Sequence, residues 1–232
     1  MAEPLGHRPA RTRSRASRLR FDGVIAGLGT RAGVRIVVGH WWRSPFGPVS
    51  DVMLETPDGH RLLLAPTSDL ARFISATYAF DEVRVTPVSV GARGDAWAVA
   101  AGPLDLRFRV GRRGRLGRLL RAVPAPLARR PAWIAVVDLP ARLLLPGVRT
   151  RGGAGGDAGG DAGGGRREWY GARDLRPVVA ATARLDGRDL GPLAPVDPPV
   201  RFGFASTPRT PALVRITTTV EVPSTAYAGR PA

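Results

Sequence analysis

Apolar and polar residues alternate with a period of two over several segments of this chain, and that pattern constrains the fold more than any other feature. Residues 104–110, LDLRFRV, place Leu, Phe and Val on one side and charged residues on the other. Residues 214–222, VRITTTVEV, repeat the alternation, with Thr218 on the apolar side. Because successive side chains of a strand point to opposite faces, each segment predicts a half-buried strand, most simply in an antiparallel sheet.

Turn and helix signals lie between such strands. The sequence Pro57-Asp58-Gly59 separates two strand-like runs and predicts a β-hairpin within residues 51–66. The next residues, TSDLARFISATY, change to a helical period, so we expect a helix over residues 68–78 with Thr67 or Ser68 as its N-cap. A second, weaker helix is expected over residues 115–123, because glycines at 114 and 117 disfavour it.

Two further segments alternate over a shorter range. Residues 200–204, VRFGF, have the pattern of a short strand. In residues 83–90, VRVTPVSV, the apolar set slips by one position at Thr86-Pro87, which predicts a bulge or a bend. We therefore expect an α+β fold: a predominantly antiparallel β-sheet of about ten strands, barrel-like or sandwich-like, with one or two short helices.

Two stretches of biased composition interrupt this pattern. Residues 1–20 carry six arginines against one acid, Glu3, and are expected to form a disordered basic arm. Residues 152–165 contain only Gly, Ala and Asp, which predicts a flexible loop. We expect a single β-rich domain over residues 21–222, interrupted by this loop, and a C-terminal tail over residues 223–232.

The composition excludes several chemistries. Lys+Arg 35 against Asp+Glu 19 gives a net charge of +16, and every basic residue of that group is Arg, since the chain has no Lys. Asn, Gln and Cys are also absent. This pattern is typical of a GC-rich genome, so genomic composition and a polyanionic partner are both explanations of the excess. Without Lys there is no Schiff-base or P-loop lysine, and without Cys there is no disulfide, thiolate nucleophile or cysteine metal site.

Neither a signal peptide nor a membrane span is recognisable in the sequence. Arginines recur throughout the N-terminal residues, and the most apolar stretch, residues 131–148, is broken by Asp138, Arg142 and three prolines. We therefore expect a cytoplasmic location and no transmembrane segment.

One glycine-rich stretch resembles a nucleotide-binding motif in its spacing. Residues 27–33 contain G-x-G-x-x-x-G, one residue longer than the dinucleotide fingerprint, and Asp51 follows where a ribose-binding acid would stand. Such a site needs a helix directly after the glycines. Residues 34–38 instead alternate with strand period, so the stretch is interpreted as a hairpin between antiparallel strands, and no cofactor is expected.

Our first hypothesis for function is a small anionic or aromatic ligand held in the concavity of the sheet. His40 and Trp42 share the apolar face of the strand that starts at residue 34, and residues 166–174, RREWYGARD, place aromatic residues beside arginines. The residues expected to line the site are His40, Trp42, Trp97, Trp169 and Tyr170, with Arg43 or Arg167 as the partner of an anion.

Two alternatives stay open. The first is binding to nucleic acid or to an anionic membrane surface through the arm and residues 107–130, which hold nine arginines and no acid. The arginines expected to make those contacts are Arg112, Arg113, Arg115, Arg118 and Arg121.

The second alternative is an enzyme of unidentified class, with His40 and Asp51 as acid and base. Asp51, Met53 and Glu55 share one face of the predicted hairpin, and we expect that face to be solvated. No metal site is expected, because the usual histidine spacings are absent.

Overall fold

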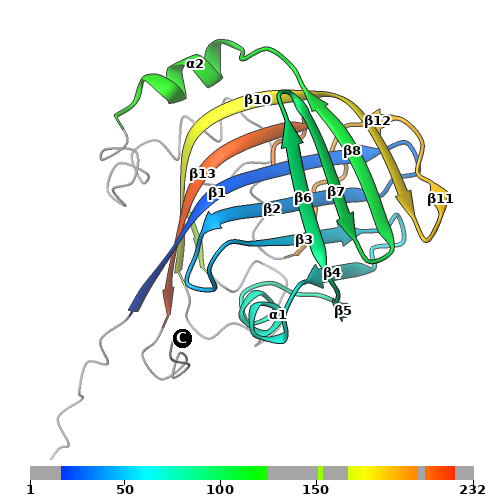
Figure 1. The fold of residues 1–232 in the computed structure, drawn as a ribbon, viewed down its shortest axis with the longest axis horizontal. Coiled ribbons are helices and arrows are strands. Elements are labelled where there is room, and N and C mark those ends of the chain that lie inside the picture. The colour runs from blue at the N-terminus through cyan, green and yellow to red at the C-terminus, as the bar shows by residue number, and fades with distance from the viewer. Residues whose placement is uncertain (1–16, 125–150, 154–166, 203–206, 223–232) are drawn as a thin grey trace, which may run out of the picture.

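A single large sheet dominates the computed structural model, which describes residues 17–124, 151–153, 167–202 and 207–222 (Figure 1). The strands are β1 (Ser17–Thr30), β2 (Arg35–Arg43), β3 (Val49–Glu55), β4 (Arg61–Ala65), β5 (Glu82–Val85), β6 (Val88–Arg93), β7 (Ala96–Ala101), β8 (Leu104–Val110), β9 (Arg151–Gly153), β10 (Arg167–Leu185), β11 (Arg188–Asp189), β12 (Leu193–Ala194) and β13 (Ala212–Val222). The helices are α1 (Ser68–Ser75) and α2 (Arg115–Ala122). The expected α+β fold with a predominantly antiparallel sheet and short helices is confirmed.

The sheet curls so that its two halves share one core. The main strand order is β5-β4-β3-β2-β1-β13-β10-β8-β7-β6, and every pair is antiparallel except β4 with β5. The long strand β10 pairs with β13 over residues 167–177 and with β8 over residues 178–185, with bulges in both ladders. As a result β6, β7 and β8 cross over β1 to β4 in Figure 1, and Leu28, Ile36 and Leu106 lie in the same buried cluster.

The second face of the central strands is buried as well. Helix α1 packs against β4 and β3 through Leu70 and Ile74, and an irregular stretch, residues 195–202, covers Val37. We call residues 195–202 the cover segment. Strand β8 keeps the expected alternation of buried and exposed residues, whereas β2, β3 and β4 are buried on both sides.

Most local expectations are met, and the exceptions have identifiable causes. The hairpin at residues 57–59 is confirmed between β3 and β4. Thr67 caps α1, and its side-chain oxygen accepts the N–H of Leu70 at 3.3 Å. The helix ends at Ser75 rather than at residue 78, because the Thr77 hydroxyl donates to the carbonyl of Phe73 and the chain turns there.

Residues 83–90 and 200–204 differ in structure from what the sequence predicts. At Thr86-Pro87 the chain bends so far that β5 joins one end of the strand order and β6 the other. The prediction of a strand at 200–204 is wrong for residues 200–202, since the N–H of Arg201 donates to the buried Glu55 carboxylate instead of to a neighbouring strand. Residues 203 and 204 lie outside the described residues.

The glycine-rich stretch forms the hairpin between β1 and β2, as expected. A Cβ added at Gly27 would lie 1.7 Å from the Cγ2 atom of Thr207, and one at Gly29 would lie 2.0 Å from the carbonyl oxygen of Pro195. Glycine at these two positions therefore lets Thr207 and Pro195 pass close to β1. This close packing explains why glycines stand there, without a bound phosphate.

The two stretches of biased composition fall mostly outside the described residues. Strand β1 begins at Ser17, so residues 17–20 of the predicted arm pair with β13, and the prediction of disorder is wrong for them. Residues 152 and 153 of the predicted loop belong to β9. Residues 1–16, 154–165 and 223–232 are not described. Within the described ranges, neither helix has the length and apolar character needed to span a membrane.

Helix α2 allows a test of whether packing against β10 or the helix propensity of alanine dominates at Gly117. Gly117 is buried, and a Cβ there would lie 2.1 Å from the carbonyl oxygen of Leu175 in β10. Alanine favours a helix by about 1 kcal/mol over glycine, but this clash with backbone forces α2 away from β10. We expect Gly117→Ala to lower the free energy of unfolding by about 1–3 kcal/mol in urea denaturation. Gly114→Ala, with open space around its Cβ, is the control; a stabilised Gly117→Ala protein would show that propensity dominates.

Candidate functional site

A cavity of about 70 Å³ lies between the sheet, helix α1 and the cover segment. Its volume is about half that of an engineered cavity of ~150 Å³ that holds benzene. Six aromatic residues form much of its wall: Phe21, Trp41, Phe73, Tyr78, Tyr170 and Phe202. Four polar residues also reach it: Asp51, Glu168, Thr207 and Thr218. A β-rich domain with such a cavity is compatible with binding of a small molecule.

Asp51 is a buried carboxylate in this wall. It lies opposite Gly39 in the pairing of β3 with β2, and its side chain is 4% exposed. The Nε1–H of Trp41 donates to its Oδ1 atom at 3.0 Å, and a Cβ on Gly39 would lie 2.6 Å from that oxygen. Burial raises the pKa of Asp51 to about 6, and the hydrogen bond from Trp41 only partly offsets that rise.

A second buried carboxylate, Glu168, is bound by two tyrosines. The hydroxyls of Tyr78 and Tyr170 both donate to its Oε2 atom at 2.8 Å, and the two hydroxyls also contact each other. Burial and the nearby Glu168 charge raise the pKa of both phenols well above the ordinary value. Both tyrosines are therefore protonated at neutral pH, and both donate their hydroxyl protons to Glu168.

Thr218 contributes a hydroxyl that the protein itself does not use. It lies opposite both Phe21 of β1 and Tyr170 of β10 in the strand pairing, which places the three side chains on one face. Its side chain is 5% exposed, and its Oγ1 atom has no hydrogen-bond partner in the described part of the chain. A buried hydroxyl in this state costs free energy, so its presence in the wall of a cavity is a functional signal.

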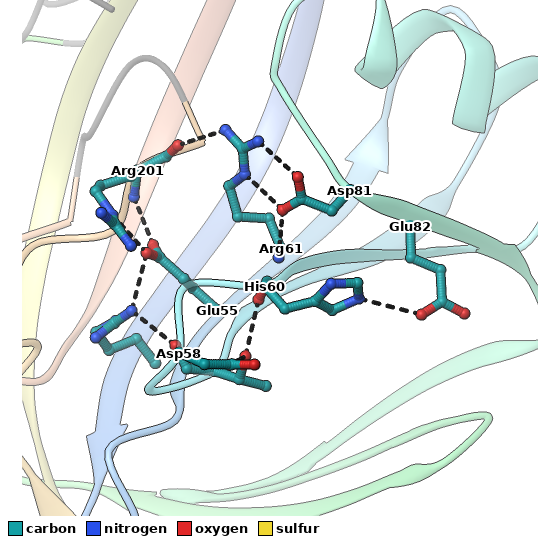
Figure 2. Close-up of polar contacts among 9 residues, drawn as sticks. Glu55, Asp58, His60, Arg61, Asp81, Glu82 and Arg201 are labelled. Atoms are coloured by element: carbon teal, nitrogen blue, oxygen red, sulfur yellow. Dashed lines mark hydrogen bonds and ion pairs between the residues drawn. The ribbon is translucent and has the colours of Figure 1, made fainter.

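Glu55 fixes the cover segment over the cavity. The Glu55 side chain is 0% exposed; its Oε1 atom forms an ion pair with Arg35 Nη2 at 2.9 Å and accepts a hydrogen bond from Arg201 Nε at 2.8 Å. Its Oε2 atom accepts the backbone N–H of Arg201 at 2.6 Å. Figure 2 shows Glu55 reaching Arg201 in this way. Because Val200 and Phe202 flank Arg201 and line the cavity, this ion pair positions one wall of the site.

The surroundings of Glu55 are more exposed. Figure 2 also shows Arg61 held by Asp81 through two contacts of 2.9 Å, while Arg61 Nη1 donates to the carbonyl of Arg201 at 3.3 Å. The side-chain hydrogen bond from Arg61 holds the pKa of Asp81 well below its usual range. These contacts secure the cover segment from its outer side.

The expectation of a solvated face on the hairpin is wrong. Asp51 and Glu55 do share a face, but α1 and the cover segment bury that face almost completely. Helix α1 follows the hairpin directly, but the cover segment comes from residues far along the sequence. Periodicity within the hairpin therefore predicts which side chains share a face, but not whether water reaches it.

The pairing of His40 with Asp51 does not exist in the fold. In the ladder of β2 with β3, His40 lies opposite Ser50 and Gly39 lies opposite Asp51, so the two side chains point to opposite faces of the sheet. His40 Nδ1 is 2.8 Å from the Ser50 hydroxyl, and burial lowers the pKa of His40. Among the described residues no group of three His, Asp or Glu side chains is placed to hold a metal ion.

The seven residues expected to bind a ligand do not converge. Tyr170 lines the cavity, but His40 lies on the other face, edge-on to Trp97 at 6.2 Å between ring centroids. Trp42 is 43% exposed, because the ladder of β1 with β2 shifts register beside it and skips it.

The other four are spread over β2, β7 and β10. Trp97 stacks on Phe108, and Trp169 lies beneath the Arg18 guanidinium at 5.7 Å. Arg43 is exposed at the end of β2. Arg167 is in β10, and its side chain lies outside the described residues. Glu168, Tyr78 and Thr218 of the cavity were not predicted; the only sequence signal was Thr218 on the apolar side of its strand.

The arginines expected to bind polyanions are partly engaged within the protein. Arg113 donates through two nitrogens to the Asp174 carboxylate, both at 2.6 Å, and Arg121 is 4.0 Å from the same group. The other three predicted contacts, Arg112, Arg115 and Arg118, are exposed. Asp174 belongs to β10. Residues 107–130 contain no acid in the sequence, but in the fold two of their arginines therefore lie beside an acid from another strand.

Comparison with known proteins identifies no family, since no family model and no curated protein matches the sequence. The crystal structure of acetoacetate decarboxylase from Legionella pneumophila is similar at a TM-score of 0.42 and 9% identity, covering 95% of each chain. A putative AttH from Nitrosomonas europaea is similar at a TM-score of 0.27 and 14% identity, covering 99% of this chain and 60% of that one. Neither likeness is close enough to support a statement about function.

Removing the Glu55 charge tests its role as the anchor of the cover segment. In Glu55→Gln, two guanidinium groups face a neutral amide in a buried position, so we expect the free energy of unfolding to fall by about 3–5 kcal/mol. Urea denaturation measures the change. The control is Glu82→Gln, which removes an exposed carboxylate paired with Arg84 and should leave stability unchanged. A loss at Glu55 no larger than that of the control would contradict the anchoring role.

The pKa of Asp51 predicts a pH-dependent stability. Because the folded carboxyl binds its proton more tightly than the unfolded one, the free energy of unfolding falls as pH rises from about 4 to about 6. Two pKa units correspond to about 3 kcal/mol of destabilisation above that range. Asp51→Asn keeps an acceptor for Trp41 and removes the charge, so we expect it to be more stable than the wild type by about 3 kcal/mol at pH 7.5 and about equal at pH 4.

Urea denaturation at pH 4, 5, 6 and 7.5 measures this difference. The matched substitution of the exposed Asp105 by Asn should leave the profile unchanged. An Asp51→Asn protein whose stability differs from the wild type by the same amount at every pH would rule out the buried charge as the cause.

Proposed function

We propose that this protein binds a small molecule whose buried part occupies the cavity beneath α1 and the cover segment. The observation that carries the proposal is the wall itself, where the described residues supply no cation to the Asp51 carboxylate and no hydrogen-bond partner to the Thr218 hydroxyl. Each costs folding free energy in the empty protein. Proteins keep such costs mainly at functional sites, where a ligand supplies the missing partner.

The size of the cavity limits what can be buried. About 70 Å³ is too small for a six-membered ring, because a cavity that holds benzene has about twice that volume. The buried part of the ligand is therefore a group of about three heavy atoms, estimated by scaling from that benzene-sized cavity. An aromatic ligand, as expected from the sequence, does not fit here without displacing side chains.

The nucleic-acid or anionic-surface alternative rests on composition. Among the five arginines named for it, Arg113 already pairs with Asp174, and no described feature adds a base-stacking or groove-reading element beside the others. We therefore place small-molecule binding first.

The test is a nuclear magnetic resonance screen of the full-length protein. Amide shifts of ¹⁵N-labelled protein are followed while compounds of three to six heavy atoms are added, with amines, alcohols, amides and carboxylates all represented. We expect saturable shifts centred on Gly39, Asp51 and Thr218. Val37→Phe extends a ring from the cavity wall into the space and should abolish them.

The control Val179→Phe makes the same change at an exposed valine of β10 and should leave binding intact. Shifts that map elsewhere, or that persist in a folded Val37→Phe protein, would overturn the proposed site, as would a screen in which no compound gives saturable shifts.

A further inference from the structure

The ionisable groups that the described residues bring to the cavity wall are opposite in charge to the whole protein. The chain carries 35 basic residues of the Lys and Arg type and a net charge of +16, yet no Arg or His is among the described residues that line the cavity. The ionisable acids there are Asp51 and Glu168. A buried anion needs a cationic partner or several donors, so this wall disfavours an anionic ligand.

The polar atoms of the described wall residues that can still form hydrogen bonds are acceptors rather than donors. Asp51 receives one side-chain hydrogen bond, from Trp41, and no Arg or His of the described residues lies within ion-pair distance of it. The hydroxyl protons of Tyr78 and Tyr170 are directed to Glu168, and the Thr218 oxygen is free to accept. A ligand that satisfies this wall brings N–H donors.

The aromatic residues favour positive charge as well. Six aromatic rings line a space of about 70 Å³, and Phe21 lies 5.6 Å from Trp41 and 5.5 Å from Phe73 between ring centroids. The faces of such rings attract cations, by about 2 kcal/mol or more where water is excluded. Aromatic rings combined with a carboxylate are the usual surroundings of a bound organic ammonium group.

We propose that the ligand of this cavity is a small organic cation, a protonated alkylamine whose ammonium group is held by the carboxylate of Asp51. This inference rests on the binding function proposed above and names its ligand class. Burial without a counter-charge raises the pKa of Asp51 to about 6, and the ammonium group supplies that charge.

Three probes of nearly equal size separate charge from shape: n-propylammonium, 1-propanol and propionate. Each is titrated into the full-length protein at pH 7.5 and constant ionic strength, and the dissociation constant is taken from the amide shifts of the cavity residues. We expect n-propylammonium to bind at least tenfold more tightly than 1-propanol, and propionate to give no saturable shift.

Two variants identify the groups responsible. Asp51→Asn retains the shape and removes the charge, so the affinity ratio of n-propylammonium to 1-propanol should fall to near one. Thr218→Val is isosteric and tests the second polar group of the wall: it should make the protein more stable, because it removes a buried hydroxyl for which the described residues supply no partner. Asp105→Asn, an exposed acid on β8, is the control and should keep the wild-type ratio.

The outcomes distinguish the two proposals. Equal affinity for n-propylammonium and 1-propanol, or a preference for propionate, would overturn the cation and leave the binding function standing. An ammonium preference that survives in Asp51→Asn would overturn the assignment to this cavity. No saturable shift with any of the three probes would overturn the cation and the proposed function together.

Discussion

Burial of both faces of the central strands is the constraint on which the rest of the structure depends. A curled sheet buries its inner face against itself, and here the outer face of β2 to β4 is covered as well, by α1 and the cover segment. Side chains that would be solvated on a simple half-buried sheet are thereby removed from water. Asp51 and Glu55 are two such side chains, and each must find its partners inside the protein or remain without them.

The two carboxylates meet that demand in different ways. Glu55 is surrounded by donors, with two guanidinium groups and one backbone N–H within hydrogen-bond distance, and it fastens the cover segment to β3. Among the described residues, Asp51 has one side-chain donor, the Trp41 indole, and no cation. A buried carboxylate whose hydrogen-bond partners are all supplied by the protein stabilises an arrangement of the chain. A buried carboxylate beside a cavity that lacks some of those partners can bind a ligand that supplies them. This contrast between neighbours on one strand separates the structural part of the face from its candidate site.

The distribution of arginine follows the same division. Among the described arginines, Arg61 pairs with Asp81 and Arg113 with Asp174 near the surface, whereas the buried Arg35 and the exposed Arg201 hold Glu55. None reaches the cavity. A strongly basic protein thus contains an interior site whose ionisable groups are acidic. Net charge describes how the surface meets other molecules and carries no information about the chemistry of a buried pocket.

The sequence by itself determined the features that depend on neighbouring residues. Alternation in 104–110 and 214–222, the turn at residues 57–59 and the Thr67 cap follow from local sterics and local hydrogen bonds, so the predominantly antiparallel sheet and its first helix could be predicted. Only the tertiary structure decided what covers each face. Tyr78 meets Glu168, Thr218 faces Phe21, and Trp42 is left exposed by a shift in strand register, because these outcomes depend on strand pairing between residues far apart in the chain.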